Sequence, residues 1–307
     1  MWKVLSGAFL GWTLGANDSA NVFGTGVATG TVKYRTSILL TSVFVLLGSI
    51  LEGPKCMATV SDLSPLLPLC AFCSSLAAAI CMTILTCLAI PASTSHAIIG
   101  AVIGAGIISG TADFSRLFKI VLCWVFTPIS GIILGYLLYR ILGYVLDRTV
   151  KAVTHRNQFY YVGIIMAGCY GAYSLGSNNV ANVTGIYVGS GVLSAKMASL
   201  VGGLSIVSGV LTYSKRVMMT VGREIVPLDP FSAFVVVLAG ALTLHIFTQI
   251  GVPVSSSQAV VGAAVGVGIV GDLRTVSPKV LVRITVGWVL TPIGAGLMAW
   301  LLVKAIS

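Results

Sequence analysis

The chain has 307 residues, of which 57% are hydrophobic and 8% are charged, and its mean hydropathy is +1.02. Soluble domains carry roughly 25% charged residues, so this composition excludes a soluble globular protein and predicts an integral membrane protein in a lipid bilayer. A net charge of +10 would favour a nucleic-acid partner in a soluble protein, but here the basic residues separate apolar segments, so we interpret them as topology signals and expect no nucleic acid.

Six mostly apolar runs approach the ~20 residues that a membrane-spanning helix needs. Their residues do not alternate between polar and apolar, as the strands of a barrel would, and lipid otherwise leaves only helices. The sequence therefore predicts an all-α polytopic membrane protein. The runs are 36–51, 67–90, 117–146, 159–175, 231–250 and 280–303.

The first apolar segment, 4–31, contains an Asn-rich phrase, LGANDSANVFGTG (14–26), in which Asp18 stands between asparagines. Lipid tolerates such a polar interruption only where protein or a watery cavity covers it. Glycines for close helix packing, with asparagines bonding helix to helix, would explain this phrase apart from its carboxylate. A carboxylate at membrane depth costs at least ~2.5 kcal/mol and normally marks an ion or proton pathway. We therefore predict that Asp18 and Asn21 bind a coupling cation, either Na⁺ or H⁺.

An acidic and basic pair and a histidine stand in or beside other apolar segments. Glu52 and Lys55 flank a Gly-Pro pair at the end of the second apolar segment, where a surface ion pair is the default interpretation. His245 stands alone on a later apolar segment. We expect it to be a buried histidine with satisfied hydrogen bonds rather than a proton relay.

A hydroxyl-rich phrase, IPASTSHAIIGAVIGAGI (90–107), begins with Pro91 and three consecutive hydroxyl residues and continues as a glycine-rich apolar stretch. The proline ends the preceding helix, and the hydroxyls cap the next one. Free N–H groups and the positive end of the helix dipole make such a terminus an oxyanion site, although simple capping is an alternative. For His96, which follows the hydroxyls, a ligand or gating role and a structural role both stay open.

Three features of the first half return in the same order in the second half. Residues 15–21 match 176–182, 90–107 match 252–269, and 124–131 match 288–295, at offsets of 161, 162 and 164 residues. Ordered matches of this kind indicate an internal repeat. The sequence therefore predicts a first repeat over 1–146, a linker over 147–158 and a second repeat over 159–307.

Each repeat divides into five apolar segments, and an odd number of crossings makes the second repeat enter the membrane from the opposite side. We therefore expect two inverted-topology repeats, with broken helices or re-entrant hairpins that meet near the membrane midplane. Segments 92–108 and 258–271 are short, so the number of crossings stays open.

The linker over 147–158 is the longest polar run and is basic, so we place it in the cytoplasm. Counting one crossing per segment outward from it puts eleven basic residues inside and six outside, with both termini outside a cell membrane. The inner set is Lys33, Arg35, Arg148, Lys151, Arg156, Lys215, Arg216, Arg223, Arg274, Lys279 and Arg283, and the outer set is Lys3, Lys55, Arg116, Lys119, Lys196 and Lys304.

Four stretches carry a resemblance to a known family: GANDSANVFGTGVATG, PASTSHAIIGAVIGAG, GSNNVANVTG and VPVSSSQAVVGAAVGVG. They resemble the paired signatures of the inorganic phosphate transporter (PiT) family, which are sodium- or proton-coupled phosphate symporters, and the resemblance spans essentially the whole chain. It implies an inverted-repeat transporter, commonly a homodimer, with phosphate held between the Asn/Asp phrases and the Ser/Thr phrases beside sodium ions.

The chain departs from the family pattern at three positions. Asn179 stands where members usually carry aspartate, Gln258 where histidine is common, and Val45 about where some members have glutamate. Of the two aspartates that family members usually carry in the two Asn-rich phrases, this chain therefore keeps only Asp18, which changes a cation or proton site. A related branch carries sulfate, but its first phrase lacks the Asn-Asp pair that this chain keeps.

These observations predict one shared site. The residues predicted to bind phosphate are Asn17, Asp18, Ser93, Thr94, Ser95, Asn178, Asn179, Ser255, Ser256, Ser257 and Gln258, and those predicted to bind the coupling cation are Asp18, Asn21 and Asn182. Amide, hydroxyl and carboxylate oxygens are hard ligands that suit Na⁺ rather than zinc or copper.

The predicted function is ion-coupled symport of inorganic phosphate, with no cofactor beyond the coupling ion. A permease for sulfate or another tetrahedral oxyanion, and a passive anion channel, are the alternatives. A channel would not need Asp18 or two matched half-sites. The sequence has no nucleophile–base pair and no clustered carboxylates, so we do not expect an enzyme.

Overall fold

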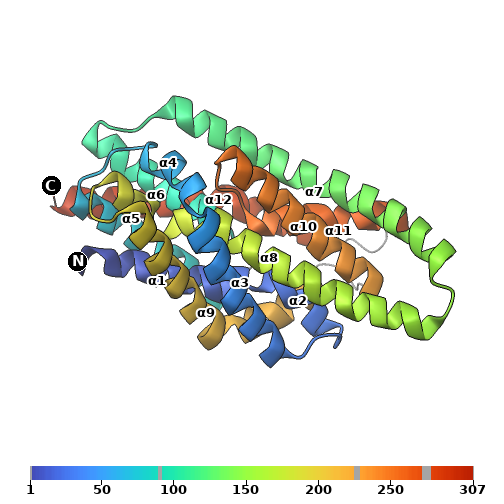
Figure 1. Ribbon diagram of the computed structural model, residues 1–307. Coiled ribbons are helices and arrows are strands. Elements are labelled where there is room, and N and C mark those ends of the chain that lie inside the picture. The colour runs from blue at the N-terminus through green and yellow to red at the C-terminus, as the bar shows by residue number, and fades with distance from the viewer. Residues whose placement is uncertain (1, 89–91, 225–228, 272–277, 307) are drawn as a thin grey trace.

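The structure is a computed structural model that describes residues 2–88, 92–224, 229–271 and 278–306, and Pro91 and Arg274 lie outside these ranges. Within them the chain is helical, with turns and short connections and no strand (Figure 1). After a 3-10 turn (Trp2–Val4), the helices are α1 (Leu5–Asp18), α2 (Ala20–Ala28), α3 (Tyr34–Glu52), α4 (Pro54–Ser61), α5 (Pro68–Cys87), α6 (Thr94–Ser109), α7 (Phe114–Thr149), α8 (Val153–Gly189), α9 (Ala195–Glu224), α10 (Pro230–Ile250), α11 (Ser256–Gly271) and α12 (Pro278–Ile306).

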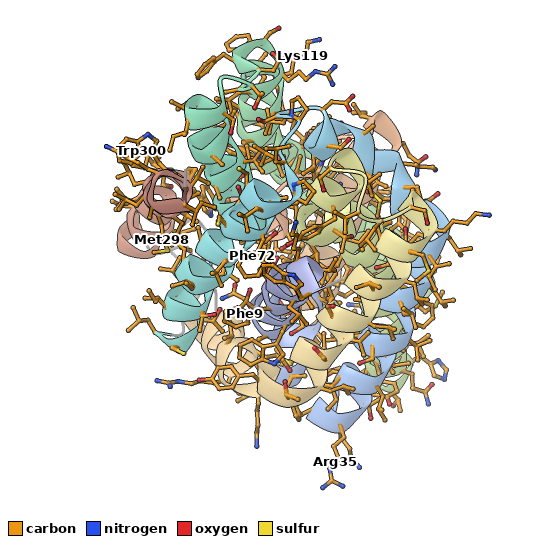
Figure 2. The ribbon with its side chains drawn as sticks, turned by 90° about the vertical axis from the view of Figure 1, so that its left-hand side faces the viewer. Phe9, Arg35, Phe72, Lys119, Met298 and Trp300 are labelled. Atoms are coloured by element: carbon orange, nitrogen blue, oxygen red, sulfur yellow. The ribbon has the colours of Figure 1, made fainter. Side chains whose placement is uncertain are left out.

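Among the described helices, six are long and apolar enough to cross a membrane, namely α3, α5, α7, α9, α10 and α12. The prediction of a multi-pass, all-α membrane protein is therefore confirmed. Figure 2 shows Arg35 and Lys119 at opposite ends of the molecule. The predicted topology assigns these two residues to opposite sides of the membrane.

The two Asn-rich phrases differ in backbone structure. In the first phrase α1 ends at Asp18, and α2 begins after Ser19. In the second phrase α8 continues from Val153 to Gly189 without interruption. A continuous helix bonds its own backbone groups, so the polar side chains of α8 need only be covered, and α3, α4 and α10 pack against this helix.

Helices α5 and α6 form a hairpin whose two outer ends are tied together. Ser64 Oγ lies 2.7 Å from Thr111 Oγ1, and Asp113 N donates to Leu63 O at 3.0 Å. Asp113 also caps α7, because its Oδ1 accepts from the N–H groups of Ser115 and Arg116. The hydrogen bond from the Arg116 N–H is the main reason that the pKa of the Asp113 carboxyl lies below its ordinary value.

The second hairpin consists of α10 and α11, which pack against each other. Helices α6 and α11 have 16 residues each, so each rises ~24 Å, which is less than the ~30 Å hydrocarbon core of a bilayer. This length favours the alternative of hairpins that turn back inside the membrane.

The helices of the two halves pack reciprocally. Helix α1 packs on α9 while α8 packs on α3, and α12 packs on α6 while α7 packs on α11. Glycines allow two of these contacts, since a Cβ on Gly48 of α3 would overlap the backbone of Tyr173 on α8, and one on Gly104 of α6 would overlap Gly296 on α12. Each half therefore covers the polar phrases of the other.

Candidate functional site

The Asn-rich phrases and the tips of both hairpins meet inside the molecule. Two hydrogen bonds join segments from opposite halves: Asn21 Nδ2 donates to Ser256 Oγ at 3.0 Å, and Asn182 Nδ2 donates to Ser95 Oγ at 2.8 Å. The structure thus brings the predicted site residues together, although they are up to 241 positions apart in the sequence. All are buried, with exposed fractions between 0% and 6%: Asn17, Asp18, Asn21, Ser93, Thr94, Ser95, Asn178, Asn179, Asn182, Ser255, Ser256, Ser257 and Gln258.

Asn178 holds the tip of the second hairpin. Its Oδ1 accepts from Val254 N at 2.8 Å, and its Nδ2 lies within hydrogen-bond distance of Thr248 Oγ1 (3.1 Å) and Val252 O (3.1 Å). Both the oxygen and the nitrogen of the Asn178 amide thus bond to other groups of the protein. Asn178 therefore positions the hairpin that carries the second set of hydroxyls.

Asn17 makes the equivalent contacts with the first hairpin. Its Oδ1 accepts from Ala92 N at 3.3 Å, and its Nδ2 donates to Thr86 Oγ1 at 3.1 Å. Thr86 and Ala92 occupy the same places in their hairpin as the threonine and the valine N–H that Asn178 contacts. The two phrases thus hold the two hairpin tips in the same way.

The first hydroxyl of each triplet caps a helix. Ser93 Oγ accepts from His96 N at 3.2 Å, and Ser255 Oγ accepts from Gln258 N at 3.3 Å. The prediction of two hydroxyl-capped helix N-termini is therefore confirmed. The remaining hydroxyls of each triplet lie in the first turn, where the N–H groups have no partner within the helix.

The innermost polar side chains come from α1, α6 and α8. Thr94 Oγ1 donates to Asp18 Oδ2 at 3.4 Å, Ser95 Oγ lies 3.3 Å from Asn179 Oδ1, and Asn182 Nδ2 donates to Asn179 Oδ1 at 2.9 Å. Hydroxyl donors from the first hairpin therefore face both the carboxylate and its counterpart amide. We call this group, Asp18, Thr94, Ser95, Asn179 and Asn182, the polar centre.

Three buried atoms of the polar centre have no hydrogen-bond partner among the described residues: Asp18 Oδ1, Asn182 Oδ1 and Asn179 Nδ2. Buried polar atoms of folded proteins almost always have a partner. Two of these three atoms are acceptors, which suit a cation, and one is a donor, which suits an anion. The centre can therefore hold ligands of both signs.

His96 faces away from the polar centre. Its ring stacks on Trp124 with 3.8 Å between centroids, and its Nδ1 lies 2.8 Å from Trp288 O. Because a carbonyl oxygen only accepts, Nδ1 donates to Trp288 O. With Gln258, His96 lines a membrane-facing groove of about 560 Å³ between α7 and α12. These contacts support the structural alternative for His96.

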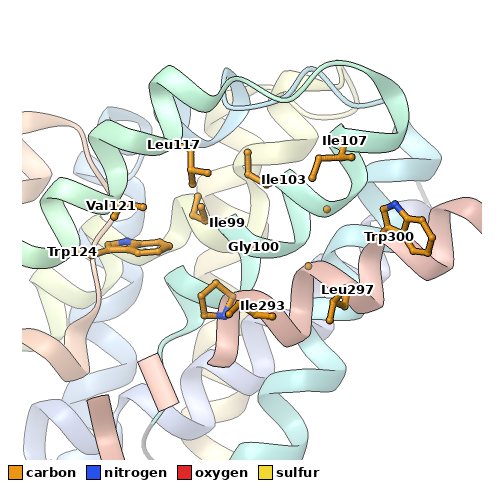
Figure 3. A pocket seen from close by; sticks show the side chains of 13 residues that line it. Ile99, Gly100, Ile103, Ile107, Leu117, Val121, Trp124, Ile293, Leu297 and Trp300 are labelled. Atoms are coloured by element: carbon orange, nitrogen blue, oxygen red, sulfur yellow. The ribbon is translucent and has the colours of Figure 1, made fainter. Parts of the chain in front are cut away.

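A second groove of about 560 Å³ lies beside it, between α6, α7 and α12 (Figure 3). Ile103, Leu117, Trp124, Leu297 and Trp300 are among its lining residues. Apolar walls give no hydrogen bonds to replace the hydration of an oxyanion. This second groove is therefore a poor candidate for an anion site, and the buried polar centre is the better one.

The predicted ion pair between Glu52 and Lys55 is confirmed, with 2.9 Å between Oε1 and Nζ, but it belongs to a larger network. Glu52 Oε2 also lies 3.0 Å from Nε2 of His245, whose Nδ1 lies 2.6 Å from the Tyr170 hydroxyl. The His245 side chain is 25% exposed, so it is partnered as predicted but is not buried. The sequence carried no signal for this contact, because no repeat or motif links Glu52 to His245.

Comparisons with known proteins identify the family of this chain and agree with its fold. A profile of the phosphate transporter family (PHO4) matches residues 14–299. A protein of Methanocaldococcus jannaschii that is assigned as a phosphate permease is 31% identical over 97% of this chain and 95% of its own length. The sulfate permease CysP of Bacillus subtilis is 28% identical over 98% of this chain and 86% of its own length.

The solved structure of a sodium-dependent phosphate transporter has the same fold, with a TM-score of 0.87 at 22% identity, over 99% of this chain and 98% of that chain. The family and these relatives are transporters, which confirms the expectation that the chain is not an enzyme. Since the profile covers nearly the whole sequence, the chain belongs to the phosphate transporter family.

Proposed function

We propose that the protein is a secondary active transporter that carries inorganic phosphate across the cell membrane together with Na⁺ or H⁺. The observation that carries the proposal is the buried carboxylate of Asp18 among hydroxyl donors at the N-termini of two hairpin helices. A site with both a negative charge and oxyanion donors favours a cation and an anion that bind together. Membership of the phosphate transporter family and relatives named phosphate permeases support phosphate as the anion.

The anion is held by donors from both hairpins. Thr94 and Ser95 on α6, and Ser256 and Ser257 on α11, have hydroxyls beside the free N–H groups of the first helical turn. A hydroxyl that donates within the protein, as those of Thr94 and Ser95 do, would turn to the anion when it binds. The positive end of each helix dipole adds to this attraction. The unpartnered Nδ2 of Asn179 supplies a further donor.

The cation is held by the two buried acceptors Asp18 Oδ1 and Asn182 Oδ1, with Asn21 nearby on α2. Oxygen ligands of this kind suit Na⁺, and the name of the sodium-dependent transporter with the same fold supports that ion. A proton on Asp18 is the alternative. Opposite charges attract strongly in a buried pocket, so each ion raises the affinity for the other, which is the requirement for symport.

The reciprocal helix packing supports two inverted repeats over 1–146 and 159–307. If each hairpin enters and leaves the membrane on one side, each repeat crosses three times, and an odd number again inverts the second repeat. The cytoplasmic linker 147–158 and the external termini follow from the basic-residue count. The family resemblance further implies a homodimer.

Uptake into proteoliposomes tests the function. Radiolabelled phosphate and sulfate are offered separately, with a Na⁺ gradient and a pH gradient imposed one at a time. Accumulation of phosphate above equilibrium under one gradient supports the proposal, and accumulation of sulfate alone supports the second candidate, which the similarity to a sulfate permease favours. Equilibration without accumulation under either gradient indicates a channel instead.

The hydroxyl triplets provide a first prediction about binding. Replacing Thr94, Ser95, Ser256 or Ser257 with alanine removes one donor to the anion, and a hydrogen bond to a charged group contributes ~1.5–3 kcal/mol. We expect apparent phosphate affinity to fall roughly tenfold to a hundredfold at the positions that contact the anion. Isothermal titration of the purified variants measures this, and normal affinity in all four would put the anion site elsewhere.

Asn179 provides a second prediction. Asn179→Asp adds a negative charge to the polar centre, where Asn182 already donates to the Oδ1 of residue 179 and the Ser95 hydroxyl lies 3.3 Å from it. We expect phosphate binding to depend more steeply on cation concentration, because a like charge faces the anion until a cation screens it. Phosphate binding is measured against Na⁺ concentration and separately against pH. Identical slopes for both forms in both titrations would exclude position 179 from the coupling site.

A further inference from the structure

A group of polar and charged side chains lies where the second hairpin meets the elbow between α3 and α4, away from the polar centre. Glu52 ends α3, and Lys55 lies in the first turn of α4, across a Gly-Pro pair. Their side chains are 19% and 43% exposed, respectively. An exposed ion pair at the end of a membrane-spanning helix contributes little by itself, so a function for this pair depends on its further contacts.

These side chains hold α10 as well as each other. Lys55 Nζ donates to Gln249 Oε1 at 2.8 Å, and Gln249 Nε2 donates to both oxygens of Glu52 at 3.3 Å and 3.2 Å. One turn further along α4, Thr59 Oγ1 donates to Gly251 O at 2.6 Å. A simple ion pair at a helix end explains none of these bonds to a second helix. We call Glu52, Lys55, Thr59 and Gln249 the elbow contacts.

The elbow contacts adjoin the segment that carries the ligand donors. Gly251 ends α10 with φ +81°, a conformation that favours glycine and allows a sharp change of direction. Three residues later Val254 N donates to Asn178, and Ser255 caps α11. A shift of Gln249 relative to the elbow would therefore move the hydroxyls of the second hairpin.

The first hairpin carries different residues at the positions that correspond to His245 and Gln249. The residues 162 positions before His245 and Gln249 are Thr83 and Cys87, which are uncharged. An asparagine thus holds the tip of each hairpin, but the two hairpins differ at the positions that contact the elbow in the second one. Among the contacts of the described residues, those of Gln249 connect the second hairpin to the Glu52–Lys55 ion pair.

We propose that the elbow contacts are a latch that keeps the second hairpin closed over the polar centre, and that their release opens the centre. The inference rests on the proposed transport function, since the site residues are at most 6% exposed and a transporter must open its site. Glu52 is the central member, because it accepts from Lys55, Gln249 and His245 together.

Cys56 is a native reporter for this opening. It follows Lys55, it is 0% exposed, and its Sγ lies 3.9 Å from Asn178 Nδ2, beneath the hairpin tip. The purified full chain is treated with a charged methanethiosulfonate reagent, and modification of each cysteine is followed by peptide mass spectrometry. The rate at Cys56 then measures how often the hairpin tip moves away.

We expect Glu52→Gln and Gln249→Ala each to raise the modification rate of Cys56 by about tenfold or more, because each removes hydrogen bonds to a charged group. Asp62→Asn is the matched control, since it breaks an ion pair with Arg116 at the end of α4 without contacting the hairpin. In that variant the rate should equal the wild-type rate. Cys73, which is buried on α5, should react equally slowly in all forms.

A wild-type rate at Cys56 in both latch variants would overturn the proposal, and so would an equal acceleration at Cys73, which would indicate general loosening. The measurement needs no substrate. A failure of phosphate uptake would therefore count against the proposed function alone, and an unchanged Cys56 rate would count against the latch alone.

Discussion

Asp18→Asn should abolish ion-driven accumulation of phosphate while the protein still folds and inserts into the membrane. The substitution keeps the shape of the side chain and removes its charge. Two unit charges 4 Å apart interact by ~4 kcal/mol at an effective dielectric constant of ~20, so cation affinity should fall by about three orders of magnitude. Phosphate uptake into proteoliposomes under a Na⁺ gradient, and then under a pH gradient, measures the effect.

The matched control is Asp62→Asn, which removes a carboxylate that is 50% exposed and paired with Arg116. This variant should accumulate as much phosphate as the wild type. The Asp62–Arg116 ion pair lies outside the site, and an exposed ion pair contributes at most ~1 kcal/mol to stability. Normal accumulation with unchanged ion dependence in Asp18→Asn would exclude this carboxylate from coupling. Another charged group would then couple phosphate accumulation to the ion gradient.

Asn178→Ala should destabilise the protein much more than the same substitution at the neighbouring Asn179. It removes the partner that Asn178 gives to the N–H of Val254 and to the carbonyl of Val252, and each unsatisfied buried group costs ~1–3 kcal/mol. We expect a loss of several kcal/mol and a thermal unfolding midpoint lower by ~5–10 °C. Thermal unfolding of the purified protein in one detergent measures this shift.

Asn179→Ala is the control on the adjacent residue. Asn179 is equally buried, but its Nδ2 has no partner among the described residues, and the two groups at its Oδ1 keep other partners, Asn182 Nδ2 at Ser95 Oγ and Ser95 Oγ at Val254 O. Its removal should therefore lower the midpoint much less while abolishing phosphate binding. Asn178→Asp should fall between the two, since it keeps an acceptor for Val254 N and loses the donor. If both alanine variants unfold at the same temperature, the division of roles between Asn178 and Asn179 is wrong.

The sequence by itself determined the class of protein and the helix starts at the hydroxyl phrases. These properties are local. Hydropathy over ~20 residues decides whether a segment partitions into lipid, and a proline followed by serine and threonine ends one helix and caps the next. Ser93 and Ser255 could therefore be recognised as helix caps before any contact between segments was known.

Only the tertiary structure decided what each polar side chain contacts. Asn178 and Asn179 have the same chemistry and are neighbours, but successive residues of a helix point ~100° apart, so one reaches the hairpin tip and the other reaches the polar centre. The same applies to Asn17 and Asp18 at the end of α1. Which of the two faces inward depends on the rotation of the helix against its neighbours, and the sequence of the phrase does not contain that rotation.

Long-range contacts were also beyond the sequence. The continuity of α8 through the second phrase and the bonds from Glu52 to Gln249 and His245 depend on how α3, α8 and α10 pack. Packing in a membrane follows from close fit between helix surfaces rather than from a local pattern of residues. The composition therefore established a membrane protein with a buried charge, whereas the packing of the helices decided which residues surround that charge and which hold the hairpins in place.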